Sequence, residues 1–333
     1  MVGGKPDIDF YWKDVGGKRR LIGNPNMPMR NLHRLFYQQI LCAIKSIGDE
    51  GYGIRKLPSA TGCVKKSNPT MNARRHIKGK YFYVTDLRNA YPSVDLRRLA
   101  TLLVFLGSYK EFADTVSVKF FMEDDNKDSI RNSPMFREML AFLKCNFSGI
   151  RGRGLAVGGP LSPYLMNLYC EVYLDARVRR WCLERNITYT RYVDDITFSS
   201  TVPISEDKRR EIRRFVYDAG FEVNHRKSRV YALSQGTIFI TKVGLEKQEG
   251  TTVARLVFPQ RKRRRLHNAI HEYLNMQRDW PEYVSGLIGE FLYYYKQVPE
   301  KTASDKKTFA LCKAFETEWA KYSKYVNRSY ARS

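Results

Sequence analysis

Apolar residues recur along the chain with two spacings, one typical of helices and one typical of strands. In residues 29–47 they fall at helical intervals, which predicts an amphipathic helix, and residues 134–147 and 162–184 show the same pattern. Residues 81–87, YFYVTDL, are rich in aromatic and β-branched side chains and predict a buried strand that ends at Asp86. The pattern therefore predicts a mixed fold that contains both helices and short strands.

Residues 187–200, ITYTRYVDDITFSS, alternate in character on both sides of Val193 and Asp194. This pattern predicts two antiparallel strands joined by a tight turn. Valine is unusual at such a turn, where asparagine and glycine are preferred. Because function can override local preference, a turn of this kind beside two carboxylates is a candidate functional site.

From about residue 246 onward the strand signals fade and helical patterns dominate. We therefore expect a mixed core over residues 1–235 and a helical, nucleic-acid-binding domain over residues 236–333. Residues 108–135 interrupt the core with an acidic, turn-forming tract that contains Glu123, Asp124 and Asp125. Acidic clusters of this kind are usually solvated loops, so a loop is favoured over a metal site there.

The composition favours a polyanionic partner. The 333 residues carry a formal net charge of +24, and 43% of them are hydrophobic, which excludes a disordered chain. Nucleic acid is the usual partner of so basic a protein, although a ribosomal or membrane-surface protein is also compatible with the charge.

No stretch approaches the roughly 20 apolar residues of a membrane-spanning helix, and no signal peptide is apparent. A cytoplasmic protein without a membrane partner is expected.

Three aspartates give the strongest chemical signal. Asp86 ends a predicted strand, and Asp194 and Asp195 occupy the predicted turn about one hundred residues later. Phosphoryl transfer to a nucleoside triphosphate needs two divalent ions about 3.5–4 Å apart, and Mg²⁺ prefers carboxylate and water oxygens. An isolated Asp-Asp pair is more often an ordinary soluble turn. Here the pair lies in a Tyr-x-Asp-Asp box between two predicted strands, which favours a metal site.

Several motifs resemble, in the same order, those of prokaryotic reverse transcriptases, and the retron type most of all. The earlier blocks are KRRLIGNP at 18–25, NARRH at 72–76 and VTDLRNAYPSVD at 84–95. The later blocks are GLAVGGPLSPYLMNLYCEVYLD at 154–175, YTRYVDDITFS at 189–199 and AGFEVNHRKS at 219–228. The resemblance implies an α+β fold, namely a right-hand polymerase with fingers, an antiparallel palm sheet that carries the YVDD hairpin, and a helical thumb.

The resemblance also implies the catalytic residues. Asp86, Asp194 and Asp195 would hold two Mg²⁺ ions, with Mn²⁺ as a substitute and the backbone carbonyl of Leu87 assisting. Tyr91 lies five residues after Asp86, where these enzymes carry an aromatic residue that collides with a ribose 2′-hydroxyl. A preference for deoxynucleotides follows, and the alternative for Tyr91 is an ordinary core aromatic.

Further residues are implied to bind the incoming dNTP. Arg20, or Arg19 in an alternative register, would contact the triphosphate, because a guanidinium group matches phosphate oxygens. Lys227 would approach the leaving phosphates, and Gly158 and Gly159 would let the backbone lie close to the nascent base pair. The alternatives are a basic surface for the arginines, a solvated lysine, and an ordinary glycine turn.

The sequence departs from the family pattern at several positions. Ala156 and Val157 stand where the family has proline and glutamine, which affects its usual nucleotide and template contacts. Val193 replaces the alanine common in the retron box, a change that should not disturb metal binding. Lys242, followed by valine and glycine, is the best match to the Val-Thr-Gly of retron thumbs, and this weakens the case for a standard retron RNA partner.

The C-terminal domain carries five consecutive basic residues at 261–265. They cannot all face one side of a helix, so Arg261, Arg264 and Arg265 are expected to track phosphates. The tyrosines at 293–295 either stack on bases or fill the core, and core is favoured for at least two of them.

A zinc site is not expected. His267 and His271 lie one helical turn apart but lack further ligands nearby, and the six cysteines include no CxxC pair. Because the cysteines are scattered along the chain, a disulfide framework is not expected either.

The resemblance to retron reverse transcriptases implies an RNA-directed DNA polymerase that copies an associated non-coding RNA into single-stranded DNA, in an antiphage defence system that can include a companion effector protein. A related alternative is a defence-associated reverse transcriptase that makes repetitive or weakly templated DNA. An alternative of another class is a catalytically idle nucleic-acid-binding scaffold. Three converging carboxylates, whose repulsion must be offset, speak against a scaffold. The sequence leaves the RNA, the primer and the oligomeric state open.

Overall fold

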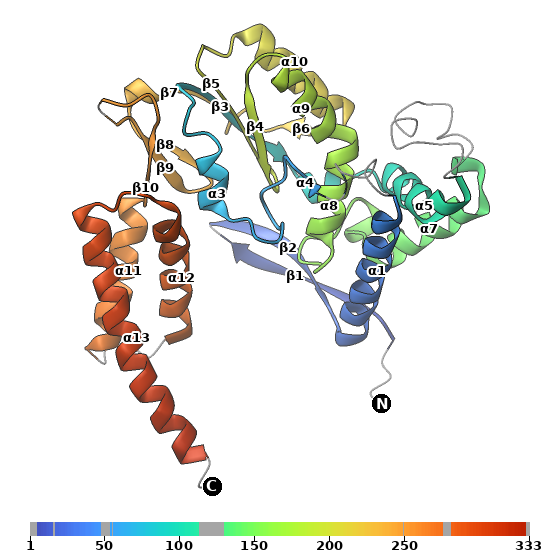
Figure 1. Ribbon diagram of the computed structural model, residues 1–333. Helices are drawn as coiled ribbons and strands as arrows, with labels where there is room; N and C mark the ends of the chain where they lie inside the picture. The colour runs from blue at the N-terminus through green and yellow to red at the C-terminus, as the bar shows by residue number, and fades with distance from the viewer. Residues whose placement is uncertain are drawn as a thin grey trace. The chain divides into compact units, whose positions relative to one another are not determined.

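Figure 1 shows the computed structural model, which describes residues 5–15, 17–47, 54, 56–112, 130–248, 250–275 and 281–330. The chain divides into two compact units, of which the first comprises Met1–Ser67 and Tyr81–Val230 and the second Asn68–Lys80 and Tyr231–Ser333. The mixture of helices and sheets confirms the α+β class expected from the sequence. The acidic tract with Glu123, Asp124 and Asp125 lies outside the described residues.

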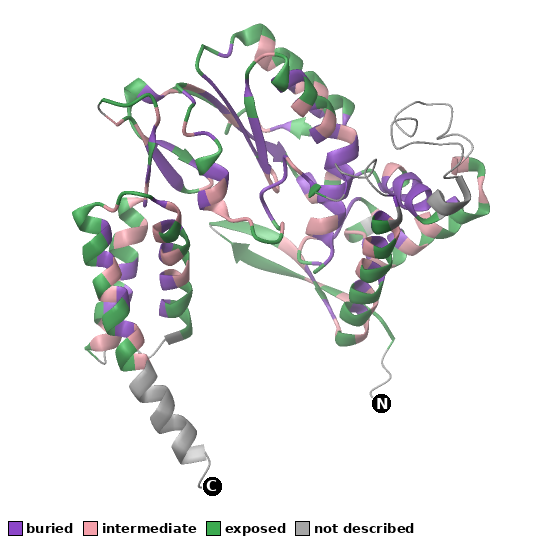
Figure 2. Cartoon of the chain, in the orientation of Figure 1, coloured by how far each residue is buried: buried purple, intermediate pink, exposed green. Residues whose placement is uncertain are grey.

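A sheet forms the centre of the first unit. Its strands, in spatial order, are β4 (Thr188–Tyr192), β5 (Asp195–Ser200), β3 (Tyr81–Arg88) and β6 (Glu222–Val223), and β7 (Arg229–Ala232) also pairs with β3. Strands β3 and β5 are antiparallel, with Asp86 opposite Asp195. Both strands are buried along most of their length (Figure 2), which explains their aromatic and β-branched composition.

Helices supply most of the remaining core of the first unit. They are α1 (Met27–Ser46), α4 (Ala90–Ser93), α5 (Leu96–Phe112), α7 (Pro134–Asn146), α8 (Ser162–Cys170), α9 (Ala176–Leu183) and α10 (Glu206–Asp218), with a short turn η3 (Ile150–Gly152). Asn26, Ser133 and Ser205 cap α1, α7 and α10, because each side chain accepts a backbone N–H of the first turn. Between α8 and α9 the chain forms one π-helical turn, η4 (Glu171–Asp175).

A hairpin of β1 (Ile8–Val15) and β2 (Lys18–Pro25) precedes α1 and exposes most of its side chains. Its backbone contacts the glycine-rich segment that leads into α8, because Gly23 N–H donates a 2.7 Å hydrogen bond to the carbonyl of Val157. Gly158 has a φ of +99°, and a Cβ atom there would lie 2.6 Å from the carbonyl oxygen of Gly23. Both its left-handed backbone and this close approach require glycine.

The second unit combines a small sheet with helices. The sheet has the order β10 (Arg255–Val257), β9 (Val243–Glu246), β8 (Ile238–Ile240), and the other elements are α3 (Pro69–Arg74), η5 (Leu233–Gln235), α11 (Gln260–Leu274), α12 (Pro281–Gln297) and α13 (Ala303–Tyr330). Within the described ranges, no helix is both long and apolar enough to cross a bilayer.

Residues 68–80 join the second unit through long-range hydrogen bonds. The N–H of Ala254 donates to the carbonyl of Ile77 at 2.7 Å, and Asn72 Nδ2 donates to Thr241 Oγ1 at 3.3 Å. On sequence alone this segment belongs to the N-terminal core, and a helical domain is predicted from residue 236. Strands of three or four residues are too short to show alternation, and packing against a distant segment leaves no local pattern.

Candidate active site on the sheet of the first unit

Asp86 lies near the end of β3, and only 4% of its surface is exposed. Its Oδ2 accepts a hydrogen bond from Nζ of Lys227, whereas its Oδ1 is buried and has no hydrogen-bond partner. A buried carboxylate oxygen without a partner costs free energy. The site therefore fits a cation, which would supply the missing partner of Oδ1.

Asp194 and Asp195 reach Asp86 from the hairpin of β4 and β5. Asp195 is the antiparallel partner of Asp86, a register in which facing Cβ atoms lie about 4.5–5.5 Å apart. Asp194 lies in the turn, and its backbone carbonyl accepts a 2.8 Å hydrogen bond from the N–H of Leu87. Facing carboxylates repel, so this register also favours a bound cation. Within the described ranges no three His, Cys, Asp or Glu side chains already form a metal-binding group, and Asp86 is paired with Lys227 instead.

The turn between β4 and β5 is strained. Val193 has a φ of +58°, in the left-handed region that β-branched residues rarely adopt. Arg191 Nη1 donates a 3.0 Å hydrogen bond to the carbonyl of Val193, and Gly62 packs against the same residue. A Cβ atom at Gly62 would lie 2.7 Å from the backbone nitrogen of Val193. The unusual turn sequence thus corresponds to backbone strain directly beside the carboxylate pair.

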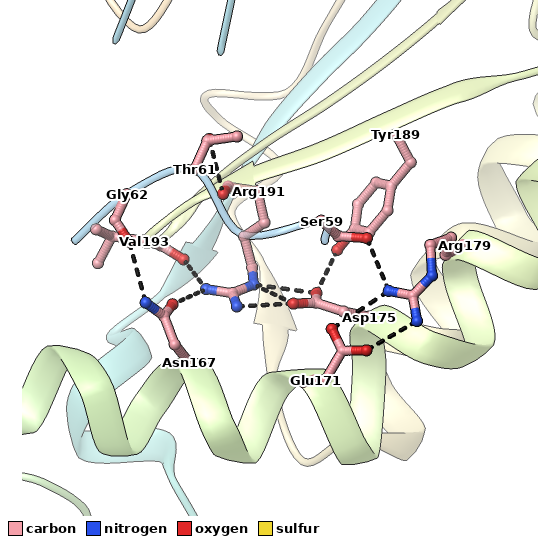
Figure 3. Close-up of polar contacts among 10 residues, drawn as sticks. All are labelled: Ser59, Thr61, Gly62, Asn167, Glu171, Asp175, Arg179, Tyr189, Arg191 and Val193. Carbon is pink, nitrogen blue, oxygen red and sulfur yellow. Dashed lines mark hydrogen bonds and ion pairs between the residues drawn. The ribbon is translucent and has the colours of Figure 1, made fainter. Parts of the chain in front are cut away.

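Arg191 belongs to a buried polar network (Figure 3). Its side chain and that of Asp175 are both fully buried, and Nη2 of Arg191 lies 2.7 Å from Oδ2 of Asp175. Asn167 accepts a 3.0 Å hydrogen bond from Nη1 of Arg191 and donates one of 3.0 Å to the carbonyl of Gly62. Tyr189 donates to Oδ1 of Asp175 at 2.7 Å. Although burial opposes it, the charge of Asp175 raises the pKa of Arg191, so the guanidinium group stays protonated.

A second ion pair lies next to this network. Arg179 donates two hydrogen bonds to Glu171, of 3.2 and 2.8 Å, and one of 3.1 Å to Ser59 Oγ. Burial raises the pKa of Glu171 to about 7, because the loss of hydration outweighs the stabilising effect of Arg179. Glu171 and Asp175 are the first and last residues of the π-helical turn η4, a feature that often occurs at functional sites.

Tyr91 lies on α4, close to the carboxylates. Burial raises the pKa of its hydroxyl, and the negative charge of Asp194 adds to the rise, which indicates that Asp194 is a near neighbour. The carbonyl of Tyr91 accepts a 2.8 Å hydrogen bond from the N–H of Leu155, which fixes the backbone of α4 against the segment that precedes α8. The structure therefore brings Tyr91 together with the catalytic candidates.

A hollow of about 840 Å³ opens beside Lys227. Cationic side chains dominate its lining, with Lys18, Arg88, Arg213, Arg226 and Lys227 against a single acid, Glu222. Arg19 and Arg20 follow Lys18 on β2 and are exposed, and the guanidinium group of Arg19 lies 5.3 Å from the centre of the Trp12 ring. Such a lining suits an anion with several charges, such as a polyphosphate.

The sequence profile of the family described as reverse transcriptase (RNA-dependent DNA polymerase) matches residues 5–250. The chain belongs to the reverse transcriptase family. The resemblance expected from the motifs is thereby confirmed, and the family's general use of divalent metal ions agrees with the unpartnered oxygen of Asp86.

Curated relatives of this reverse transcriptase include two from Myxococcus xanthus. The retron Mx65 reverse transcriptase is 31% identical over 198 residues, which cover 58% of this chain and 44% of the relative. The retron Mx162 reverse transcriptase is 29% identical over 192 residues, which cover 53% of this chain and 37% of the relative. The chain thus spans less than half the length of these relatives. Among solved structures, a telomerase of Candida albicans in complex with the TWJ fragment of telomeric RNA has a TM-score of 0.48 and 11% identity, over 93% of this chain and 59% of that one.

The basic run of this reverse transcriptase lies on α11, in the other unit from the three aspartates. Arg261, Arg264 and Arg265 are the exposed members, and Arg265 also donates a 2.6 Å hydrogen bond to a tyrosine of α12. The remaining two are engaged in ion pairs, Lys262 with an acid of α12 and Arg263 with a buried acid of α13. The exposed members are thus the three that the sequence analysis selected for phosphate contacts.

Other C-terminal candidates are part of the packing. Tyr294 is buried and Tyr295 stacks on a phenylalanine of α13 with ring centres 4.5 Å apart, whereas Tyr293 is 61% exposed. Core roles for two of the three tyrosines were expected and are confirmed. His267 Nε2 lies 2.9 Å from a threonine hydroxyl of α13, a contact that a structural histidine would make.

The sequence alone does not identify the residues that hold the turn, namely Arg191, Asp175 and Asn167. One signal for Arg191 was present, because residues 187, 189 and 191 share one face of an alternating strand. Ile187 and Tyr189 on that face are buried, so an arginine between them and the Asp-Asp pair had to be buried too. Its partners, 16 and 24 residues earlier in the chain, could not be read from the sequence.

Proposed function

We propose that this chain is an RNA-directed DNA polymerase that adds deoxynucleotides to a primer, with Asp86, Asp194 and Asp195 as its catalytic carboxylates. The observation that carries the proposal is the buried, unpartnered Oδ1 of Asp86 opposite Asp195, in a chain of the reverse transcriptase family. The three carboxylates, with the carbonyl of Leu87 assisting, would hold two Mg²⁺ ions, which Mn²⁺ can replace. When bound, such ions activate the primer hydroxyl and neutralise the leaving pyrophosphate.

Lys227 has two tasks in this proposal. Before nucleotide and ions bind, its ammonium group neutralises Asp86. Its side chain is 47% exposed and lines the basic hollow, so it can turn from the carboxylate to the phosphates of an incoming dNTP. Arg20, or Arg19, would bind the same phosphates from strand β2. The first residue of this strand, Lys18, lines the hollow, so the two arginines lie close to it in the chain.

Tyr91 would set the sugar preference. Its position near Asp194 supports a place beside the sugar of the incoming nucleotide, where an aromatic ring excludes a 2′-hydroxyl. Gly158 would let the backbone lie close to the nascent base pair. The close approach of Gly158 to Gly23 also requires a glycine at position 158 for packing alone. A test of nucleotide binding must therefore be separate from a test of folding.

In the right-hand description, residues 1–235 would form the fingers and palm, and residues 236–333 the thumb. The sheet that carries the YVDD hairpin would be the palm. The exposed Arg261, Arg264 and Arg265 on α11 would bind the phosphates of the template-primer duplex, and their exposure supports this role.

We further propose that the template is an associated non-coding RNA and the product single-stranded DNA, made in the cytoplasm as part of antiphage defence together with a companion effector protein. The similarity to retron reverse transcriptases supports this setting. Sequencing of the nucleic acid that copurifies with the protein distinguishes this proposal from the alternative, in which the DNA is repetitive or weakly templated.

The polymerase proposal is tested by the double variant Asp194→Asn with Asp195→Asn. It should abolish metal-dependent incorporation of dNTPs on an RNA template, while circular dichroism and RNA binding stay close to those of the unaltered protein, because the lost charges act on the ions and not on the core. The matched control is Asp207→Asn, since Asp207 is an exposed acid of α10 in an ordinary surface ion pair. Full polymerase activity of the double variant would refute the mechanism.

A further inference from the structure

We propose that Arg191 is a positioning residue of the catalytic turn. Supported by Asp175 and Asn167, it clamps the strained backbone of Val193 and thereby fixes Asp194 for metal binding. The inference rests on the proposed function, because it assigns a task to a residue that touches neither the substrate nor the ions. It begins from the number and direction of the hydrogen bonds that the guanidinium group makes (Figure 3).

The guanidinium group of Arg191 is bound on two sides. Towards α8 and η4, Nε and Nη2 donate to the carboxylate of Asp175 at 2.7–3.1 Å, and Nη1 donates to Oδ1 of Asn167 at 3.0 Å. Towards the turn, the same Nη1 donates to the carbonyl of Val193 at 3.0 Å. A planar group held at three atoms cannot rotate away, so the bond to Val193 has a fixed direction.

The helical side of the clamp is held in place by the packing. Asp175 is the last residue of the π-helical turn η4, and both it and Asn167 are almost completely inaccessible to solvent. The hydroxyl of Tyr189 occupies Oδ1 of Asp175, and Asn167 spans from Arg191 to the carbonyl of Gly62. Both residues that orient Arg191 therefore have a second hydrogen-bond partner, which makes the buried network more rigid.

The other side of the turn is closed by backbone. Gly62 packs against Val193 so closely that a Cβ atom would lie 2.7 Å from its backbone nitrogen, and the N–H of Thr61 donates to the carbonyl of Arg191 at 2.8 Å. Val193 is thus held between Gly62 and Arg191 in a left-handed conformation that it would not adopt alone. The next residue, Asp194, leaves the turn in a fixed direction and bonds through its carbonyl to Leu87 beside Asp86.

Two variants remove the clamp in different ways. Arg191→Lys keeps the buried charge but replaces a fork by a single ammonium group, which cannot reach Asp175, Asn167 and Val193 together. Asn167→Leu keeps the branched shape of the side chain and the Arg191–Asp175 ion pair but removes one of the atoms that orient Arg191. The control is Arg179→Lys, which weakens the neighbouring pair with Glu171 and removes none of the side-chain hydrogen bonds of Arg191.

The decisive measurement is Mn²⁺ binding, followed by electron paramagnetic resonance of the free ion, in full-length protein whose fold is checked by circular dichroism. Both clamp variants should raise the Mn²⁺ dissociation constant by about two- to tenfold, the range expected for loss of one oriented hydrogen bond, with unchanged affinity for template-primer. Arg179→Lys should lower the melting temperature and leave the Mn²⁺ constant unchanged. A merely structural role of Arg191 would change the melting temperature alone.

The outcomes separate this inference from the proposed function. Folded Arg191→Lys and Asn167→Leu proteins that bind Mn²⁺ like the unaltered chain would overturn the clamp, and Asn167→Leu decides alone if Arg191→Lys does not fold. An unaltered protein that binds Mn²⁺ but incorporates no dNTP would refute the polymerase, while the binding constants continue to decide the clamp. An unaltered protein that binds no Mn²⁺ overturns both.

Discussion

Replacement of Lys227 by methionine should strengthen metal binding and slow catalysis at the same time. In the structure the ammonium group of Lys227 is bound to Oδ2 of Asp86, so a cation that approaches this carboxylate must displace it. Methionine has a similar length and no charge, and its side chain leaves both oxygens of Asp86 to the ions. The loss of a positive charge beside the phosphates should act in the opposite direction on nucleotide addition.

The expected gain in metal affinity follows from the solvent exposure of the Lys227–Asp86 ion pair. The side chain of Lys227 is 47% exposed and that of Asp86 is 6% exposed. Solvent screens a pair with one half-exposed partner, so its strength belongs near the upper end of the values for surface ion pairs, about 1 kcal/mol. Since about 1.4 kcal/mol corresponds to a factor of ten, Mn²⁺ should bind about fivefold more tightly to Lys227→Met without nucleotide. Loss of a cation that stabilises charge on the phosphates should slow single-turnover incorporation about a hundredfold.

Mn²⁺ titration and rapid-quench incorporation on the same protein preparations test both signs. Lys227→Arg is the matched control, because it keeps the charge and should leave Mn²⁺ binding close to that of the unaltered chain. Weaker or unchanged Mn²⁺ binding in Lys227→Met would show that Lys227 does not compete with the ions for Asp86. The two effects would then need separate explanations.

Three further changes test other parts of the molecule. Tyr91→Ala should raise the use of rNTPs relative to dNTPs in single-nucleotide incorporation, and an unchanged ratio would remove Tyr91 from the sugar site. Replacing Arg261, Arg264 and Arg265 by Gln should reduce template-primer affinity and lower the log–log salt slope by about 0.7–0.9 per lost phosphate contact, whereas an unchanged slope would leave these residues as solvated surface. Burial raises the pKa of Glu171 to about 7, so its protonated form favours the folded state and the free energy of unfolding should fall as the pH rises from about 4.5 to 7, by at most about 3 kcal/mol. Denaturant titration of Glu171→Gln should lack this contribution, and a variant with the pH dependence of the unaltered chain would contradict the raised pKa.

Much of the sheet could be predicted from the sequence because its signals are local. The aromatic and β-branched run of β3 and the alternation around Val193 each occupy a few consecutive residues, and the structure has strands at both places. The proximity of Asp86 and Asp195 required one more step, the pairing of β3 with β5. The ordered motifs supplied this step, since no local pattern specifies which strands become neighbours.

The residues that support the site were not predictable in the same way. A buried Arg191 is tolerated only because it is paired with Asp175 and hydrogen-bonded to Asn167. The sequence predicts the helical segment that carries these two residues but not its packing against the strand of Arg191. In the same manner, Lys262 and Arg263 look like members of a basic surface until α12 and α13 supply their acidic partners. Charges whose partners come from other elements need the tertiary structure to be interpreted.

The second unit is built from two segments that are far apart in the sequence, so they are synthesised at different times. Residues 68–80 leave the ribosome about 150 residues before the C-terminal part of their unit begins at Tyr231. At about 5–20 residues per second, this segment waits roughly 8–30 s for the chain that contributes Thr241 and Ala254 to its hydrogen bonds. Asn72 and His76, which are buried in the finished protein, would be accessible to water during that interval. A nascent chain halted before Tyr231 would therefore expose the surface of residues 68–80 that the finished protein covers.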